Sequence, residues 1–451
     1  MSEPSPDVPR PTSPPRPGPP RADRRTFLGA GAALGAALAC RAVPRGRTAA
    51  LAGGAGDGDE LDELFSELTD QRERFEPISP AERRTRRARL ARLLAAAGTD
   101  ALLVEHGPTL DYLTGLAWGR SERLLGLVAL ADGGSFWVLP AFEEASLRGK
   151  LAAAGAPAKK LVTWDEHEYA FAPLAAELER RRVERLAAEP STRGFVLHGL
   201  EAAWKRRVLP GVELVLLLRG RKDEHELRLL RAANELTQEA IVAVAERLRP
   251  GLKDREIGAW MRRAQERLGL ARPWVLPLLG PSAALPHGSP RGKTLARGDT
   301  ILVDTGGSFL GYQSDCTRSW SFGAAPSATY ERVWNVVRDA QRTAFEALVP
   351  GGRARDVDAA ARRRIAAGGF GAGYESFTHR LGHGIGLEGH EGPYLDGGSE
   401  AILAPGMCFS DEPGIYLPGE LGVRLEDIVS VTETGADHFG GWQRSPLSPA
   451  P

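Results

Sequence analysis

This chain has little cysteine and no excess of charge of either sign. Three Cys among 451 residues cannot form a disulfide scaffold for so long a chain, so a hydrophobic core has to hold the fold together. The 58 basic residues balance the 58 acidic ones, so nothing global attracts the protein to nucleic acid. No uncharged apolar run reaches the roughly 18 residues of a membrane-spanning helix. These absences exclude a multi-spanning membrane protein, and the composition favours a globular enzyme with two folded domains.

The first 55 residues do not have the composition of a folded domain. Nine of the first 20 are Pro, so we expect disorder there. Arg24-Arg25-Thr26-Phe27-Leu28 then precedes a short run of Gly, Ala and Leu, which is typical of a twin-arginine export signal. A chance arginine pair in an Ala/Gly-rich tail is the alternative interpretation. The signal predicts an extracytoplasmic protein, periplasmic or secreted.

The processing of this signal stays open. Ala37-Leu38-Ala39 and Ala50-Leu51-Ala52 both resemble cleavage sites for signal peptidase. Cys40 follows the first of them and could carry a lipid, although Ala37 stands where lipoprotein signals usually have a larger aliphatic residue. Lipidation of Cys40 is the one form of membrane attachment that the sequence suggests.

Residues 60–220 alternate short apolar runs with charged, helix-like stretches. We expect helices at 141–154 and 171–187, and strands at 102–106, 124–130, 135–140, 160–164, 194–198 and 212–217. Strands that alternate with helices predict an α/β domain with a mixed or parallel sheet. The four histidines of this half stand apart from acidic clusters and are interpreted as surface or packing residues: His106, His167, His198 and His225.

Residues 222–447 contain one helical phrase twice. A long amphipathic helix that stops at Pro250-Gly251 is followed by a second helix, and the same order returns at Pro350-Gly351. Apolar positions repeat at the same spacing of 100 residues: Leu248, Ile257 and Ala259 correspond to Leu348, Val357 and Ala359. The repetition predicts an internally duplicated α+β domain.

Each copy of the helical phrase is followed by strand-like segments that carry two acidic residues. TILVDTGG holds Asp304 and GYQSDCTRSW holds Asp315, with glycines and Ser308 between them that suit the turn of a hairpin. In the second copy, FSDEPGIY holds Glu412 and GVRLEDIVSV holds Glu426, with Arg424 on the same face as Glu426 in a continuous strand. Buried carboxylates are costly unless positive charge compensates them.

Histidines supply the remaining candidate ligands. FTHRLGHGIGLEGHEGPY contains His379, His383 and His390, and its glycines favour an extended, tightly packed backbone over a helical metal motif. His287 precedes the first acidic strand. One His with four carboxylates suits hard-to-borderline divalent ions, and bridging carboxylates can hold two of them. Mn, Co, Zn and Fe all fit this chemistry.

Together these motifs resemble the pita-bread metallopeptidases, in particular the proline-specific branch with prolidase (Xaa-Pro dipeptidase) and Xaa-Pro aminopeptidase. The resemblance covers about residues 222–440 through ALPHG, ILVDTGGSFLGYQSDCTRS, FTHRLGHGIGLEGHEGPYL, LAPGMCFSDEPGIYLPGELGV and VRLEDIV. The first half, with LDYLTGL, is similar to the creatinase-type N-terminal domain of the proline-specific members.

The resemblance assigns roles to single residues. It implies two divalent ions, Mn first among the candidates, held by five ligands: Asp304, Asp315, His383, Glu412 and Glu426. It makes Asp315 and Glu426 the bridging carboxylates and Glu412 the acceptor of a proton from the attacking water. His379 and His390 would contact the substrate and the tetrahedral intermediate, and His287 would line the pocket. Arg424 and Tyr416 would orient the cluster.

The expected reaction is hydrolysis of the bond before proline by a metal-bridging hydroxide, in Xaa-Pro dipeptides or short Xaa-Pro peptides. The resemblance also implies a homodimer. Alternatives stay open: an Xaa-Pro aminopeptidase that acts on longer peptides, or a hydrolase of another amide-like small molecule. The second alternative to the expected enzyme is a binding protein that keeps the fold without hydrolysis. The complete set of ligands argues against the second alternative.

Overall fold

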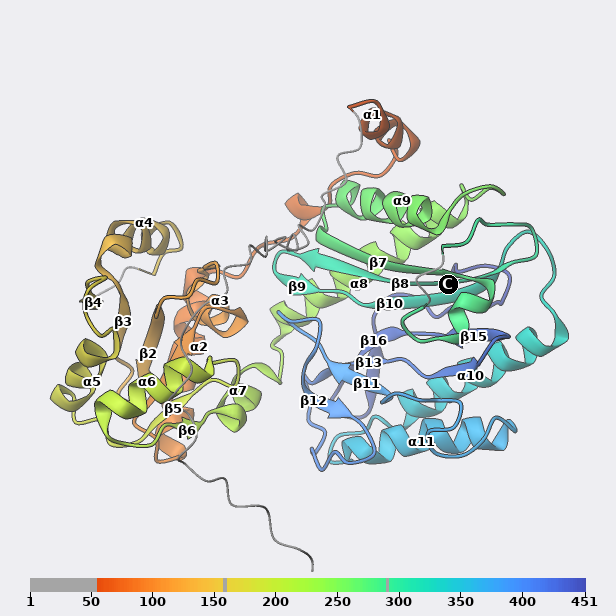
Figure 1. Ribbon diagram of the computed structural model, residues 1–451. Helices are drawn as coiled ribbons and strands as arrows, with labels where there is room; N and C mark the ends of the chain where they lie inside the picture. The colour runs from red at the N-terminus through yellow and green to blue at the C-terminus, as the bar shows by residue number, and fades with distance from the viewer. Residues whose placement is uncertain (1–54, 157–159, 289–291) are drawn as a thin grey trace, which may run out of the picture. The chain divides into compact units, whose positions relative to one another are not determined.

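The structure is a computed structural model that describes residues 55–156, 160–288 and 292–451 (Figure 1). The expected export signal at Arg24-Arg25 and the candidate lipidation site Cys40 lie outside these residues. Within the described ranges, no helix is both long and apolar enough to cross a membrane. A short helix, α1 (Ala55–Leu64), and a 3₁₀ turn, η1 (Arg72–Arg74), precede the first domain.

The N-terminal domain is an α/β layer, as the sequence predicts. Its six-stranded sheet has the order β4-β3-β2-β1-β5-β6, in which β1–β2 and β2–β3 are antiparallel and the other pairs are parallel. Apolar side chains form a separate core on each face of this sheet. The strands are β1 (Ala101–Glu105), β2 (Gly126–Leu130), β3 (Ser135–Pro140), β4 (Leu161–Trp164), β5 (Leu186–Ala188) and β6 (Leu209–Pro210). The helices are α2 (Pro80–Ala96), α3 (Pro108–Thr114), η2 (Ala141–Glu143), α4 (Glu144–Ala153), α5 (Phe171–Arg180), α6 (Gly194–Trp204) and α7 (Val212–Arg219).

The prediction of two strands in this domain, at 194–198 and 212–217, is wrong, because both segments are helical. In α6 the buried residues Val196, Leu200 and Trp204 are spaced by four, so one helical face is apolar beyond the short run. In α7 the face with Leu214 and Leu218 is buried, while Leu217 is 53% exposed. A short apolar run does not distinguish a strand from one helical face. The helix expected at 171–187 ends at Arg180, and β5 follows.

The C-terminal domain contains the predicted duplication. The first repeat consists of α8 (Glu224–Ala245), α9 (Asp254–Arg267), β7 (Ala271–Leu279), η3 (Gly280–Ala284), β8 (Thr300–Phe309), β9 (Tyr312–Gln313) and β10 (Cys316–Ser321). The second consists of α10 (Ala328–Ala347), α11 (Ala354–Ala367), β11 (Gly382–Gly384), β12 (Glu391–Leu395), β13 (Cys408–Asp411), β14 (Gly414–Leu417), β15 (Leu421–Arg424), β16 (Asp427–Val431) and β17 (Ala436–His438). The main sheets run β10-β8-β7, with β9 paired to β8, and β12-β11-β13-β16-β17.

The turn between the two helices of each repeat is built in the same way. The Gly251 N–H donates to the Leu295 carbonyl at 2.9 Å, and the Gly351 N–H donates to the Leu403 carbonyl at 2.9 Å. Both glycines have positive φ, 98° and 83°, a conformation that Gly adopts without steric cost. Equal contacts at equivalent positions therefore confirm that the repeated phrase is a structural repeat.

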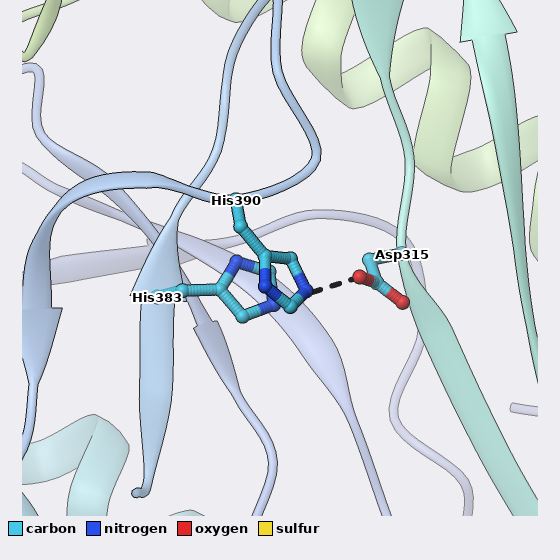
Figure 2. A group of neighbouring side chains, drawn as sticks. All are labelled: Asp315, His383 and His390. Carbon is cyan, nitrogen blue, oxygen red and sulfur yellow. Dashed lines mark ion pairs between the residues drawn. The ribbon is translucent and has the colours of Figure 1, made fainter. Parts of the chain in front are cut away.

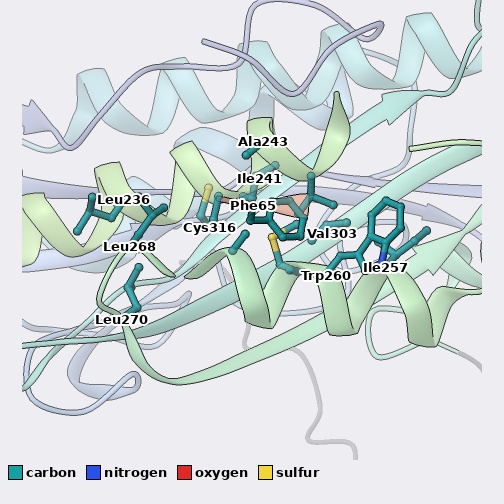
Figure 3. Close-up of a cluster of buried hydrophobic side chains, with 14 of the residues drawn as sticks. Phe65, Leu236, Ile241, Ala243, Ile257, Trp260, Leu268, Leu270, Val303 and Cys316 are labelled. Carbon is teal, nitrogen blue, oxygen red and sulfur yellow. The ribbon is translucent and has the colours of Figure 1, made fainter. Parts of the chain in front are cut away.

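Each repeat also has its own core. Figure 3 shows the first core, where side chains of α8 and α9 such as Ile241, Ile257 and Trp260 pack with Val303 and Cys316 of the sheet. The second core lies between α10, α11 and the strands of the second repeat. In Figure 1, α8 and α9 lie beside the sheet of the first repeat, and α10 and α11 lie beside the sheet of the second. Cys316 and Cys408 are buried free thiols.

Two local expectations in the acidic strands are corrected. The hairpin of β8 and β10 forms, but its turn lies at Leu310-Gly311 and Ser308 belongs to β8. Gly306 lies within β8. A Cβ at this position would lie 1.9 Å from the Ser314 carbonyl oxygen, so the glycine allows the two main chains to approach closely and does not form a turn. The last strand is interrupted, since β15 ends at Arg424 and β16 begins at Asp427.

Candidate metal centre

Four carboxylates from the two repeats converge where the two sheets meet. Thr317 of β10 and Glu426, in the gap between β15 and β16, form an antiparallel bridge with N–H···O distances of 3.3 and 3.1 Å. This bridge joins the edge of the first sheet to the second repeat beside a cavity of about 770 Å³. The cavity is lined by Trp274, Leu276, Pro286, His287, Asp304, Asp315, His379, Arg380, His383, His390, Asp396, Glu412, Arg424 and Glu426. All the predicted ligands are thus in one place.

The first repeat contributes Asp304 from β8 and Asp315 from the residue before β10. Asp304 Oδ2 accepts a hydrogen bond from Arg424 Nη2 at 2.6 Å, and the Asp315 main-chain N–H donates to Asn234 Oδ1 at 3.1 Å. The Oδ1 atoms of both aspartates are buried and have no hydrogen-bond partner among the described residues. Buried carboxylate oxygens are rarely left in this condition, because their desolvation is then uncompensated. Both atoms are consequently free to coordinate a cation.

The second repeat contributes His383, in the middle of β11, and Glu412, directly after β13. His383 Nε2 lies 3.6 Å from Asp315 Oδ2 and 3.5 Å from Glu412 Oε1. Burial lowers the pKa of His383 to about 3, so its imidazole is neutral. Its Nδ1–H donates to the Gly384 carbonyl at 3.1 Å, which leaves the Nε2 lone pair for a metal. Gly382 allows this placement, since a Cβ there would lie 1.9 Å from the Ser410 carbonyl oxygen.

A chain of hydrogen bonds fixes the polar side of the cavity. Arg424 Nη1 donates to the Tyr416 hydroxyl at 2.8 Å, and this hydroxyl lies 2.8 Å from His379 Nε2. His379 Nδ1 lies 2.8 Å from the Arg380 carbonyl. Arg424 Nε donates to Thr317 Oγ1 at 3.1 Å, and Thr317 Oγ1 donates to a Glu426 carboxylate oxygen at 2.6 Å. Both ring nitrogens of His379 are therefore engaged within the protein, although its side chain lines the cavity.

The charges of this site do not balance within the protein. Burial raises the pKa of Asp315 and of Glu426 well above the usual range, and neighbouring carboxylates add to the effect. Burial also raises the pKa of Glu412 to about 7. The buried guanidinium of Arg424 is the cation paired with this cluster, through Asp304. Four acidic side chains with one such partner lack positive charge that bound cations would supply.

The donor geometry fits metal ions. Ligand atoms lie within 4.8 Å of one another in three sets: Asp304, Asp315 and Glu426; His383, Glu412 and Glu426; and Asp315, His383 and His390. Asp315, His383 and Glu426 each belong to two of these sets, so the three sets form one continuous cluster. Oxygen ligands with one or two imidazoles suit divalent ions from the hard to the borderline class. The residues present therefore fit the metal ions that the resemblance implies.

His390 faces the cluster from the loop before β12. Figure 2 shows its ring overlapping that of His383, with Asp315 opposite. The ring centroids of His383 and His390 are 3.7 Å apart at an interplanar angle of 26°. Arg380 Nη2 donates to His390 Nδ1 at 3.2 Å, so a neutral His390 carries its proton on Nε2. His287 is exposed and lines the same cavity, next to Pro286.

Several cavity residues escaped the sequence analysis. Arg380 follows His379 directly and lines the cavity just before β11 begins. Thr317 shares a face of β10 with Asp315, and that spacing of two was an available signal. Trp274 of β7 and Asp396 after β12 had no sequence signal, since only the assembled fold brings them to the cavity.

Comparisons with known proteins agree with this geometry. The model of metallopeptidase family M24 matches residues 228–433, and that of the creatinase/prolidase N-terminal domain matches residues 86–220. A probable dipeptidase, PepE, of Mycobacterium tuberculosis is 38% identical over 346 residues, which cover 76% of this chain and 90% of the relative. An Xaa-Pro dipeptidase of Pyrococcus horikoshii is 30% identical over 348 residues, with 76% and 93% covered.

A solved structure shows the same architecture. The crystal structure of dipeptidase PepE from Mycobacterium ulcerans superposes with a TM-score of 0.77 at 33% identity, over 83% of this chain and 100% of that one. The predicted fold, a creatinase-type N-terminal domain followed by a duplicated pita-bread domain, is thereby confirmed. The chain belongs to metallopeptidase family M24 and is a metallopeptidase of the prolidase type.

Proposed function

We propose that this enzyme hydrolyses the peptide bond before proline in Xaa-Pro dipeptides, with two divalent cations in the cavity. One observation carries the proposal: within the described ranges, two three-residue ligand sets share Glu426, and the carboxylates of the first repeat leave buried oxygens without partners there. We assign the five ligands as the resemblance does: Asp304, Asp315, His383, Glu412 and Glu426. Divalent cations in this position would lower the pKa of a bound water toward neutrality and polarise the scissile carbonyl group. Mn is the first metal to test.

Glu412 is the best placed residue to carry the proton. Its Oε1 accepts a hydrogen bond from Ser410 at 3.1 Å, which holds the carboxylate in place, and Glu412 lines the cavity. In this proposal the Glu412 carboxylate takes a proton from the attacking water and delivers it to the proline nitrogen as the bond breaks.

His390 is assigned to the carbonyl oxygen of the substrate. With Nδ1 accepting from Arg380, its Nε2–H is available as a donor to the oxygen on which negative charge develops. The bond before proline is a tertiary amide without an N–H, so a pocket for it needs no acceptor at that nitrogen. The apolar side chains of Trp274, Leu276 and Pro286 line the cavity and offer a surface for the pyrrolidine ring.

Arg380 favours a dipeptide over a longer substrate. Arg424 is neutralised by Asp304, whereas the cavity-lining Arg380 has a neutral hydrogen-bond partner in His390. The α-carboxylate of a dipeptide is an anion next to the bond to be broken, and a guanidinium is well suited to bind it. A longer peptide presents an uncharged amide at that place. We therefore assign Arg380 to the carboxylate of the proline product.

The test is product analysis with the full-length, Mn-loaded enzyme. Ala-Pro, Gly-Pro and Ala-Pro-Ala are incubated separately, and free proline and free alanine are quantified. We expect proline from the dipeptides and little alanine from the tripeptide. Arg380→Gln should raise KM for Ala-Pro about 10-fold or more, because a hydrogen bond to a charged group contributes roughly 1.5–3 kcal/mol. Faster release of alanine from the tripeptide than of proline from Ala-Pro would identify an Xaa-Pro aminopeptidase instead. No hydrolysis of any of them with metal bound would refute the proposed substrate class.

We further propose twin-arginine export, with the protein acting as a homodimer outside the cytoplasm. The export proposal is supported by the Arg24-Arg25 motif and its apolar extension. Cell fractionation of the wild type and of an Arg24→Lys/Arg25→Lys variant tests it, and an equal distribution of both proteins would refute it. Light scattering of the purified protein at micromolar concentration tests the dimer.

A further inference from the structure

A cluster of four charged side chains lies behind the loop that carries His390. Arg219, the last residue of α7, places Nη2 2.7 Å from Glu388 Oε2 and 2.5 Å from Glu391 Oε2. Lys222 Nζ donates to the other oxygen of Glu391 at 2.7 Å. The side chains of Arg219, Lys222 and Glu391 are at most 8% exposed. Two cations and two anions thus form a neutral, largely buried cluster, which we call the Arg219 clamp.

The clamp holds the loop on both sides of His390. Glu391 follows His390 directly, and Glu388 stands two residues before it. Behind the loop, Lys222 and Glu391 pack so tightly that a Cβ on Gly386 would lie 2.7 Å from Glu391 Oε1. Although burial favours the neutral acid, Lys222 and Arg219 keep the pKa of Glu391 below its usual value, so the cluster is charged at neutral pH.

Packing alone does not fix His390. The residue is exposed, and it lines a second cavity, of about 480 Å³, in addition to the metal cavity. Among the described residues, the His390 side chain has one hydrogen-bond partner, the long side chain of Arg380. The position of the His390 ring against His383 consequently depends on how firmly the main chain is held on both sides, at Glu388 and at Glu391. Of these two residues, Glu391 is anchored by two cations.

We propose that Arg219 is a positioning residue for the hydrolytic reaction, and that it acts by holding Glu388 and Glu391 so that His390 faces the substrate carbonyl. A residue of the N-terminal domain would then be required for the chemistry of the C-terminal domain. Arg219 is itself held from that side, because its Nη1 donates to Thr109 Oγ1 of α3 at 3.0 Å. The inference rests on the proposed role of His390, and its test separates the two.

The chain offers a matched control in Arg86. This arginine of α2 also reaches from the N-terminal domain to a buried acid of the C-terminal domain, with Nη2 2.9 Å from the Tyr312 hydroxyl and 3.4 Å from Glu226 Oε1. Its side chain is 6% exposed, against 7% for Arg219. Neither Arg86 nor its partners line the metal cavity. Arg86→Met therefore reproduces the loss of a buried ion pair without touching the His390 loop.

The experiment compares Arg219→Met, Arg219→Lys, Arg86→Met and His390→Ala in the full-length enzyme at saturating Mn²⁺. For each variant kcat and KM on Ala-Pro, metal content and melting temperature are measured. We expect Arg219→Met to lower kcat about 10–100-fold, the range typical of outer groups that orient an active-site histidine. Arg219→Lys keeps the charge and should recover part of the loss. Arg86→Met should lower the melting temperature by a similar amount and leave kcat unchanged. Combined with His390→Ala, Arg219→Met should have no further effect on kcat.

The outcomes distinguish the clamp from the role of His390. If His390→Ala leaves kcat unchanged, the role of His390 is refuted and the clamp has nothing to position. If His390→Ala impairs turnover while Arg219→Met behaves like Arg86→Met, the clamp alone is refuted. The clamp alone is also refuted if missing metal explains the lower kcat of Arg219→Met. It is likewise refuted if the kcat losses of Arg219→Met and His390→Ala add in full in the double variant. Should Arg219→Met fail to fold, Arg219→Met/Glu391→Gln removes the unpaired acid, and the same cycle with His390→Ala applies.

Discussion

The two repeats of the C-terminal domain share a scaffold but differ in chemistry. Each has a helix pair joined by a Pro-Gly turn, its own apolar core and two acidic residues at the junction of the sheets. Within the part of the chain that the structure describes, the carboxylates of the first repeat, Asp304 and Asp315, have buried oxygens without partners. Those of the second, Glu412 and Glu426, accept hydrogen bonds from Ser410 and Thr317. Asp304 is also held, through Oδ2, by Arg424 of the second repeat. The contrast is that each aspartate of the first repeat keeps one buried oxygen without a partner among the described residues, whereas side-chain hydrogen bonds hold both glutamates of the second.

The second repeat alone supplies the histidines of the ligand sets and the arginine that pairs with the cluster. His383 and Arg424 have side chains that are 2% and 5% exposed, and both are fixed by hydrogen bonds to neighbouring groups. Duplication explains why two pairs of carboxylates meet, because equivalent strands of two similar units face each other. Duplication does not explain why the two repeats differ in chemistry. That difference arises from side chains, such as His383 and Arg424, that the second repeat supplies. The predictions below test this contrast between the repeats.

The largest effect is expected where the two repeats are altered at matched ligands. Asp315→Asn should remove metal and turnover together, since a ligand in two of the three sets is lost. Glu412→Gln should reduce kcat on Ala-Pro by about 10²–10⁴, because the proton acceptor is lost. We expect its metal content to fall less than that of Asp315→Asn. Elemental analysis and steady-state kinetics on the same preparations give both quantities.

Ser410→Ala is the control for Glu412→Gln, because it removes the hydrogen bond to Oε1 and leaves the carboxylate. It should cost much less turnover than Glu412→Gln. Full activity of Glu412→Gln with metal bound would overturn the assignment of Glu412. If Asp315→Asn kept its metal while Glu412→Gln lost it, the contrast between a binding first repeat and a reacting second repeat would be wrong.

A smaller effect is expected from pH in the metal-free protein. Asp315, Glu412 and Glu426 have raised pKa values because burial disfavours their charged forms, and Glu412 reaches about 7 against a usual 4.5. Between pH 4.5 and 7 the folded protein therefore binds more protons at Glu412 than the unfolded chain does. The free energy of unfolding from this group must fall as pH rises through that window, and it levels off above pH 7.

Urea unfolding of the metal-free protein at pH 5, 6, 7 and 8 measures this dependence. Glu412→Gln cannot ionise, so its unfolding free energy should decline less steeply than that of the wild type. Mn²⁺ should stabilise the wild type most at pH 7–8, where the carboxylates are charged and bind it. An equal slope for the wild type and Glu412→Gln would contradict the raised pKa of Glu412.

Much of this fold could be predicted from the sequence, since the signals were local. The duplication is visible as a helix–Pro-Gly–helix pattern that recurs after 100 residues. The strands β1 to β4 alternate with turn-rich segments. The helices α6 and α7 could not be recognised as such, because their apolar runs are as short as strands. Whether such a run is a strand or one helical face depends on what it packs against, and that is a property of the whole domain.

The site was predictable to the extent that its residues stand in glycine-rich, strand-like phrases. The five ligands and Arg424 meet in one cavity, as the resemblance implies. Arg219 and Lys222 were hidden because charged residues near a domain border are ordinarily solvent-exposed. Their partner Glu391 is about 170 residues away in sequence, so only the folded chain reveals the cluster. Contacts over such separations have no sequence period by which they could be recognised.

The smallest effect tests the symmetry of the scaffold itself. Gly251 and Gly351 have φ values of 98° and 83°, and no atom lies within 4 Å of the Cβ that alanine would add at either position. The cost of Gly251→Ala or Gly351→Ala is therefore conformational alone, about 1–2 kcal/mol for a left-handed residue. If the repeats share their scaffold, both variants should lose the same unfolding free energy in urea, and the double variant should lose the sum. Activity should be unchanged in all three, since both turns lie outside the metal cavity. Unequal losses, or a loss of metal from one variant only, would show that the contrast between the repeats extends from their side chains into their scaffold.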